Sequence, residues 1–215
     1  RCGGFGRGVD ERNAQAVMGL SYLPKQGQTP LDPEHLSGLR LVGVTTKVQL
    51  DELEQLNIQS AMTWLIRNPP KHDSLLKEKF IKSLHKRMFG DVWHWAGNFR
   101  RVDTNIGVDW WKIPSELKVL MDDAQFWLEH NTYPKEEWAI HIKHRLVSIH
   151  CFPNGNGRHS RLFADLLINN FGNMPYFTWG AQSNLDEQTT RTNYLTSLRT
   201  ADLGDYRPLI QLALN

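Results

Sequence analysis

Apolar residues recur at helical spacing along most of this chain, with polar residues between them. On this spacing, helices are predicted over residues 48–65, 74–88, 117–128, 135–149, from Arg158 onward and over 186–201. Pro69-Pro70 ends the first of them, because a residue before proline avoids helical backbone angles. Pro114-Ser115 is typical of a helix start and precedes the third. We therefore expect an all-α fold.

Residues 98–111 interrupt this pattern. They lack a helical period but contain an alternating stretch and Gly107, which is typical of a small β-hairpin. The other interpretation is an ordinary connection that Trp110 and Trp111 pin to the core. The residues alone leave both interpretations open.

The first 27 residues are rich in glycine and polar side chains and show no sustained period. We expect a flexible extension over residues 1–27 and one domain over 28–215. With 215 residues, 40% of them hydrophobic and 22% charged, the chain is long enough for one substantial core.

Net charge and hydropathy bear on which classes of partner the protein can have. The net charge of +2 does not favour nucleic acid or an anionic membrane as a partner, and the eight tryptophans are expected to pack in the core. No apolar run reaches the roughly 18–20 residues that a membrane span needs. We expect a cytoplasmic protein with neither a nucleic-acid nor a membrane partner.

The stretch from His150 to Arg161 carries the candidate chemistry. The preceding helix brings His150 to its C-terminal end, and the glycines and asparagines of 153–157 form a tight turn. A second helix follows, and the N–H groups at a helix N-terminus favour a bound anion. Arg158 and Arg161 offer forked donors to phosphate, and His150 can take a hydroxyl proton near neutral pH. The plainer interpretation is a helix–turn–helix with solvated arginines and a satisfied histidine, but the combination favours a phosphate site beside a base.

This stretch resembles the signature of the Fic family, H-x-F-x-[D/E]-G-N-G-R-x-x-R. The matching residues are His150, Phe152, Gly155, Asn156, Gly157, Arg158 and Arg161. Residues 28–213 also resemble the Fic branch called mobile mystery protein B. That likeness is carried by Thr29-Pro30-Leu31-Asp32, by Leu84 to Trp93, by Trp95-Ala96-Gly97, by Asn105-Ile106-Gly107 and by Tyr176 to Gly180.

The resemblance implies a Fido-fold helical domain with a β-hairpin flap, and transfer of AMP from ATP to a hydroxyl side chain of a target protein. It makes His150, Arg158 and Arg161 the catalytic residues. It assigns the nucleotide to these two arginines and to Phe152, Asn154, Gly155, Asn156 and Gly157, with Phe152 anchoring the loop in the core. The target would pair with the flap, residues 98–111, by β-augmentation.

Two positions depart from the family pattern. Cys151 replaces the usual proline, where we expect a small buried side chain rather than a redox-sensitive thiol. Asn154 replaces the acidic residue that helps the family hold Mg²⁺, so the metal must rely more on the nucleotide phosphates. Asparagine is usual at this position in the mobile mystery protein B branch.

Fic proteins are often inhibited by a helix bearing [S/T]-x-x-x-E-[G/N], whose glutamate pairs with the second motif arginine. This chain contains no strict match. Glu54 and Glu187 are the nearest candidates, and the plainer interpretation of both is a solvated helix carboxylate.

The sequence thus predicts a protein adenylyltransferase that uses ATP and Mg²⁺. The alternatives are a phosphotransferase or another nucleotidyltransferase, and a nucleotide-binding module that pairs with a mobile-element partner or antitoxin. His141, His144 and His150 suggest zinc, but no acidic or cysteine ligand follows at a recognisable spacing. We expect His141 and His144 to lie on the helix surface or to pack.

Overall fold

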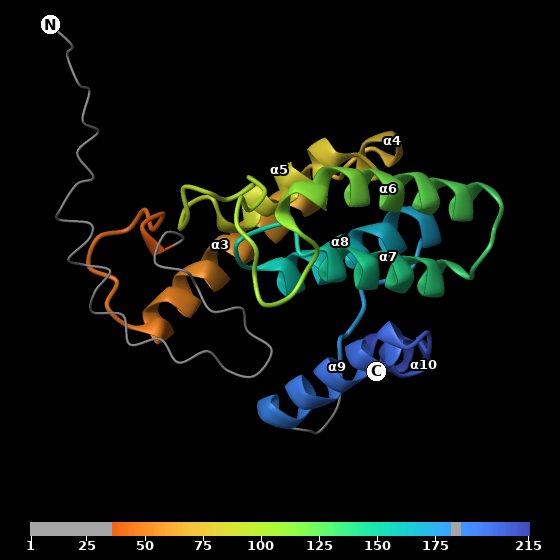
Figure 1. Ribbon diagram of the computed structural model, residues 1–215. Coiled ribbons are helices and arrows are strands. Elements are labelled where there is room, and N and C mark those ends of the chain that lie inside the picture. Colours follow the sequence, from red (N-terminus) through yellow and green to blue (C-terminus); the bar gives the residue numbers. More distant parts are fainter. Residues whose placement is uncertain (1–35, 182–185) are drawn as a thin grey trace, which may run out of the picture.

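The structure, a computed structural model, describes residues 36–181 and 186–215. It is built from helices: α3 (Lys47–Arg67), α4 (His72–Leu75), α5 (Glu78–Phe89), η1 (Trp110–Lys112), α6 (Ile113–Glu129), α7 (Lys135–Ile149), α8 (Asn156–Gly172), α9 (Glu187–Asp202) and α10 (Arg207–Leu214). Figure 1 shows their arrangement. The predicted all-α fold is confirmed. The extension predicted over residues 1–27 and the Thr29–Asp32 segment lie outside the described residues.

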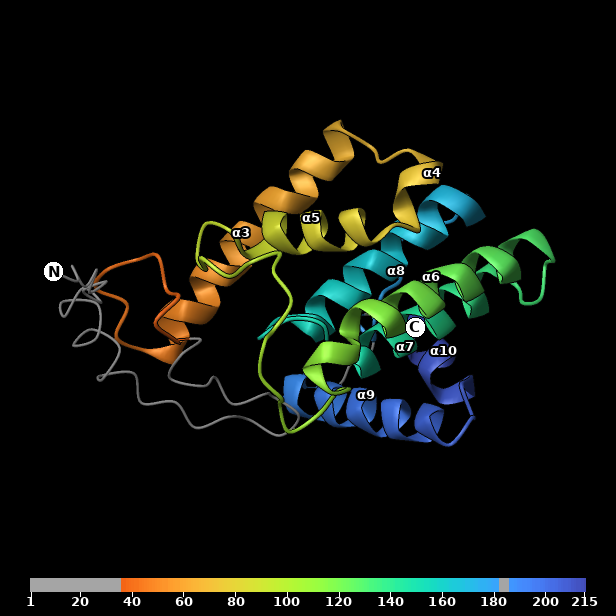
Figure 2. The same cartoon turned by 45° about the horizontal axis from the view of Figure 1, so that its top comes forward.

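Helix α8 lies at the centre of the molecule. It packs against α7 and also contacts α5, while α3 runs along α5 on one side. On the other side, α6 packs on α7, and α10 contacts both α7 and α9 (Figure 2). The turn between α7 and α8, which carries the motif, therefore has helices on either side of it.

Helix α3 has a well-defined start and end. The side chain of Thr46 accepts a hydrogen bond from the N–H of Gln49, and the side chain of Gln49 accepts one from the N–H of Thr46. This reciprocal capping satisfies N–H groups that have no partner inside the helix. Asn68-Pro69-Pro70 follows the last turn, as predicted.

The single helix predicted over residues 74–88 is wrong. The chain forms the short helix α4, leaves helical geometry at Leu76, and begins again with α5 at Glu78. Leu75 and Leu76 are both buried. Adjacent residues of one helix point about 100° apart, so the break lets both side chains reach the core.

Helix α7 has the predicted bounds, but its buried residues are not confined to one face. Residues on several of its faces are buried, including Trp138, Ile140, Lys143 and Leu146. Such burial fits its place between α6, α8 and α10. The C-terminal half of the chain differs from the prediction in two other respects. Helix α8 begins at Asn156 rather than at Arg158, and α10 was not predicted.

The β-hairpin predicted within residues 98–111 is also wrong. Among the described residues the structure has no strand, and its one β-bridge joins Leu39 to Trp93. The segment is an irregular connection that ends in η1. Trp110 and Trp111, which anchor the loop to the core in the other interpretation, are 41% and 57% exposed. The buried side chain of Arg100 holds this connection in place instead.

The described helices include none that is long and apolar enough to cross a membrane.

Candidate active site

His150 lies directly after the last turn of α7, in the left-handed backbone conformation with φ 58° and ψ 60°. Its side chain is buried, with 4% of its surface exposed. Burial, and then the charge of Arg100, lower the pKa of His150 to about 4, although a hydrogen bond with the backbone of Val147 acts in the opposite direction. The imidazole is therefore neutral at pH 7, which is the form that can accept a proton.

Phe152 anchors the loop in the core, as predicted. The side chain is fully buried and stacks on the ring of His85 with 3.7 Å between centroids. Asn156 fastens the same turn, because its Oδ1 accepts from the N–H of Phe152 at 2.9 Å and its Nδ2 donates to the carbonyl of Phe152 at 2.7 Å. The side chain of Asn156 thus faces inward, and its backbone is what it can offer to phosphate.

The two glycines of the turn meet different constraints. Gly155 has φ +79°, and a Cβ there would come within 2.6 Å of the ring of Phe89. Gly157 has nothing within 4 Å of where a Cβ would lie. Gly157 stands in the first turn of α8, where N–H groups have no partner inside the helix. Open space beside such N–H groups suits an anion.

His85 supports the loop at Asn154. The N–H of Gly97 donates to its Nδ1 at 3.1 Å, so the proton lies on Nε2, which donates to the carbonyl of Asn154 at 3.0 Å. Burial lowers the pKa of His85 well below its usual value and keeps the ring neutral. The side chain of Asn154 is half-buried and offers one neutral oxygen.

Arg158 is held by an acidic residue from outside the motif. Its Nη2 lies 2.7 Å from Oε2 of Glu54, and its guanidinium lies 4.9 Å from the ring centre of Phe89. The other carboxylate oxygen of Glu54 accepts from Nε1 of Trp93 at 2.6 Å. Glu54 is only 2% exposed, so its interpretation as a solvated carboxylate is wrong, and it pairs with the first motif arginine rather than the second.

Arg161 faces different neighbours. Its guanidinium lies 5.2 Å from the ring centre of Tyr194 in α9. The hydroxyl of Tyr194 accepts a hydrogen bond from Nζ of Lys143 at 2.7 Å, and burial lowers the pKa of this lysine well below its usual value. The two motif arginines therefore have different neighbours, because Arg158 contacts α3 and α5 whereas Arg161 contacts α9.

Cys151 is buried, and burial raises the pKa of its thiol to about 12. A thiol with such a pKa is not reactive, which agrees with the expected role as a small buried side chain.

The histidines of α7 pack, as expected. His144 lies 2.9 Å from a carboxylate oxygen of Asp202, and the ring of His141 lies 3.8 Å from that of Tyr206. Within residues 36–181 and 186–215, no group of three or more His, Cys, Asp and Glu side chains is arranged to hold a metal ion.

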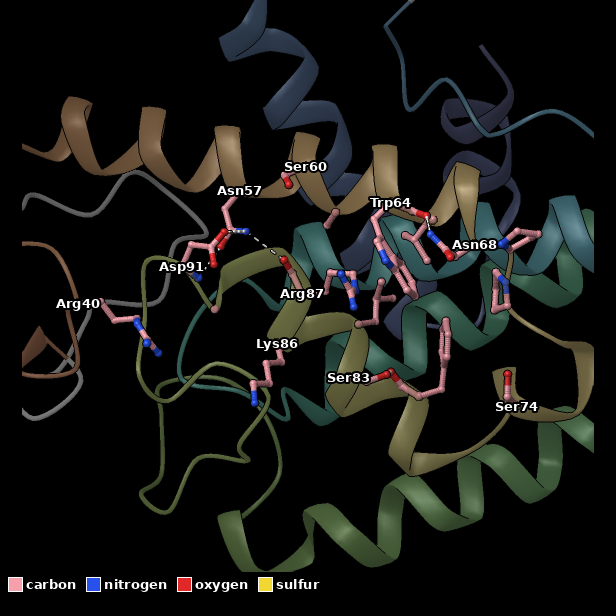
Figure 3. Close-up of a pocket in the computed structure, with 17 residues that line it drawn as sticks. Arg40, Asn57, Ser60, Trp64, Asn68, Ser74, Ser83, Lys86, Arg87 and Asp91 are labelled. Atoms are coloured by element: carbon pink, nitrogen blue, oxygen red, sulfur yellow. Dashed lines mark hydrogen bonds between the residues drawn. The ribbon is translucent and has the colours of Figure 1, made fainter.

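A groove of about 1010 Å³ lies between α3 and α5, away from the motif residues. Figure 3 shows Asn57 reaching across it to the end of α5, where its Nδ2 donates to the carbonyl of Arg87 at 3.1 Å and to Asp91 at 3.0 Å. The guanidinium of Arg87 stacks on the ring of Trp64 at 3.5 Å from its centre. Trp64 is 40% exposed, so the expectation that all the tryptophans pack in the core is wrong here as well as at Trp110 and Trp111.

With this geometry described, the chain can be compared with known proteins. The model of the Fic/DOC family matches residues 75–168. Residues 75–168 of this chain belong to the Fic/DOC family. Proteins named "Protein adenylyltransferase Fic" are 28% identical over 162 residues in Aedes aegypti and 32% identical over 137 residues in Drosophila grimshawi. The matches cover 74% and 62% of this chain but only 31% and 27% of those proteins, so the chain spans about a third of their length or less.

Solved structures show the same fold. Fic-1 of C. elegans superposes with a TM-score of 0.61 at 24% identity over 81% of this chain and 50% of that one. BepC of Bartonella tribocorum, solved with bound AMPPNP, has a TM-score of 0.60 at 18% identity, covering 81% of this chain and 91% of that one.

Several residues around the site were not predicted from the sequence. Arg100, His85, Tyr194 and Lys143 all contact motif residues or their neighbours. Glu54 had been considered, and its position among Leu50, Ile58 and Ala61 places it on the buried face of α3. A charged residue on an apolar helical face was the one local signal that it has a buried partner.

Proposed function

We propose that this chain is a protein adenylyltransferase that transfers AMP from ATP to a hydroxyl side chain of a target protein. The observation that carries the proposal is a buried, neutral histidine at the end of one helix, joined by a five-residue turn to the arginine-bearing start of the next. The curated relatives named as adenylyltransferases support this reaction over other phosphate chemistry.

The residues divide the work as follows. His150 takes the proton of the target hydroxyl, whose oxygen attacks the α-phosphorus of ATP. A new P–O bond forms, the bond between the α-phosphorus and the bridging oxygen breaks, and pyrophosphate leaves. The N–H groups at the start of α8, with Arg158 and Arg161, stabilise the charge on the phosphates. Arg158 can use its Nη2 for this only after that atom separates from Glu54.

Asn154 is the residue of this turn that would hold Mg²⁺. Its amide oxygen is a single neutral ligand, and Mg²⁺ commonly takes most of its oxygens from substrate phosphates and water. The donor set therefore fits a metal carried largely by the nucleotide. Bound Mg²⁺ would neutralise phosphate charge.

We propose that the target docks along residues 98–111. Because this connection has no strand, backbone pairing of the kind first expected would require it to become extended. Its exposed apolar side chains, Ile106, Trp110 and Trp111, offer a contact surface without that change. A mobile-element partner or antitoxin that controls the site is a further proposal from the sequence.

The pairing of Arg158 with Glu54 favours one second candidate. A protein whose phosphate-binding arginine is already occupied, and whose metal ligand is neutral, could act as a nucleotide-binding module with little catalysis. A phosphotransferase uses the same anion site and differs in which phosphorus reacts.

Incubation with Mg²⁺ and ATP labelled at the α- or the γ-phosphate, in parallel, separates these candidates. Label from the α-phosphate on protein supports AMP transfer, and label from the γ-phosphate alone would instead establish a kinase. Binding of ATP without either label on protein would favour the module. His150→Ala should abolish transfer while nucleotide affinity stays within about twofold, and full activity in this variant would exclude His150 as the base.

A further inference from the structure

Arg100 is a buried cation that binds two separate segments of backbone. It is 2% exposed and belongs to the irregular connection between α5 and α6. Its side chain donates to the carbonyls of Val102 at 3.0 Å, Ile149 at 3.4 Å and His150 at 2.7 Å, and also to that of Val108. The N–H of Arg100 donates to the carbonyl of Cys151 at 3.0 Å. Arg100 thus joins the connection to the residues on both sides of His150.

The contacts lie where the backbone of α7 ends. The last carbonyls of a helix have no partner inside it and carry partial negative charge, which a cation stabilises. His150 adopts the left-handed conformation, which costs a residue other than glycine about 1–2 kcal/mol. The guanidinium donates to two of these carbonyls, those of Ile149 and His150, and therefore favours the one backbone conformation in which both reach it.

Gly107 shows how closely the connection passes His150. Its φ is +107°, and a Cβ there would lie 2.6 Å from Cβ of His150 and 2.8 Å from Nη2 of Arg100. The N–H of the next residue, Val108, donates to the carbonyl of Ile149 at 3.3 Å. The connection therefore packs directly against His150 at Gly107, and Arg100 is buried between the connection and the end of α7.

We propose that Arg100 is a positioning residue for the transfer reaction, holding His150 in the geometry in which it accepts the proton of the target hydroxyl. The proposal rests on the function proposed above. In the proposed reaction Arg100 acts through His150 and does not contact the phosphates itself. Its removal should therefore affect kcat rather than the affinity for the nucleotide.

The charge of Arg100 also bears on the imidazole. After burial, this charge is the second cause of the lowered pKa of His150. Burial lowers the pKa of Arg100 itself, whereas Asp103, whose Oδ1 lies 3.6 Å from Nη1, and Asp109 raise it. Removing the charge should therefore raise the pKa of His150 toward its ordinary value of about 6.5. A role in packing alone does not require this change.

The test compares Arg100→Met and Arg100→Lys with Arg67→Met, which removes the same charge from an exposed position at the end of α3. Arg100→Met should lower kcat by about 100-fold or more, since small displacements of reacting groups cost this much, with the Kd for ATP within about twofold. Arg100→Lys keeps the charge but loses the fork, so kcat should fall while the NMR titration of His150 stays near that of the wild type. Arg67→Met should change neither quantity.

Folded Arg100→Met protein with wild-type kcat and an unchanged His150 titration would overturn the proposal. If the methionine variant does not fold, Gly107→Ala tests the same contact with Arg100 present, and unaltered kcat and His150 resonances in it would count equally against positioning. In the wild type, the Arg100 Nε–H should exchange slowly with water, and fast exchange would contradict its bond to His150. The titration and the exchange need no transfer activity, so they remain decisive if the proposed reaction is wrong.

Discussion

Replacing Glu54 with glutamine should increase nucleotide affinity and automodification. Nη2 of Arg158 now contacts Oε2 of Glu54 at 2.7 Å, and the same guanidinium is the donor proposed for phosphate. A phosphate that binds Nη2 of Arg158 must first break this pair. Glutamine removes the charge but keeps an oxygen that can accept from Nε1 of Trp93, so most of the buried contact is preserved.

The size of the effect follows from the burial of the two partners. A hydrogen bond to a charged group contributes about 1.5–3 kcal/mol. Glu54 is 2% exposed but the side chain of Arg158 is 30% exposed, so solvent screening places the pair toward the lower end. About 1.5–2 kcal/mol corresponds to roughly 10–30-fold in the Kd for ATP.

Calorimetric titration with ATP and Mg²⁺ measures the affinity, and label from the α-phosphate of ATP measures automodification. Glu52→Gln is the matched control, because it makes the same substitution at an exposed position of α3. Glu54→Gly should also raise automodification, but it loses the contact with Trp93 and adds about 1 kcal/mol of helix-propensity cost, so its Tm should fall further.

If folded Glu54→Gln binds ATP no more tightly than Glu52→Gln and modifies itself no faster, the pair does not oppose nucleotide binding. A Tm lower than that of the control, without a change in affinity, would show that Glu54 serves the core and not the site.

The remaining predictions concern the metal and a buried lysine. Asn154→Asp should lower the Mg²⁺ concentration for half-maximal transfer by about tenfold, because a carboxylate is a stronger Mg²⁺ ligand than an amide; an unchanged Mg²⁺ dependence would exclude Asn154 as a ligand. Burial depresses the pKa of Lys143, so the folded state binds this proton less well than the unfolded state. The free energy of unfolding of the wild type should therefore rise relative to that of Lys143→Met as the pH increases toward 10.5. Urea denaturation of both proteins across this pH range measures the difference. A difference that stays constant would mean that the lysine is charged in the folded state.

The long helices were predictable because each has a continuous apolar face. Helix α7 matches its predicted bounds, although the periodicity did not show that Lys143 on it would also be buried. Helix α10 was missed since its two turns are too short for a period to be evident. The hairpin was wrongly expected because alternation along one segment does not show whether a neighbouring strand exists to pair with it.

The motif residues were predictable from a local pattern, whereas their partners were not. Arg100 and Arg101 are adjacent and chemically identical, yet one is buried against α7 and the other is exposed. The difference arises from contacts with residues about fifty positions away, such as His150, which no local pattern contains. The same reasoning applies to Glu54 and Arg158, whose pairing depends on how α3 lies beside α8.

These partners act on different parts of the proposed reaction. Burial, and then the charge of Arg100, keep His150 neutral, and the hydrogen bonds of Arg100 hold its backbone in place. Glu54, in contrast, occupies the arginine that a phosphate requires. We therefore expect Glu54 to oppose nucleotide binding and Arg100 to assist proton removal. Glu54 should therefore raise KM, and high ATP concentrations should overcome its effect. Loss of Arg100 should lower kcat, and high ATP concentrations should not restore that activity.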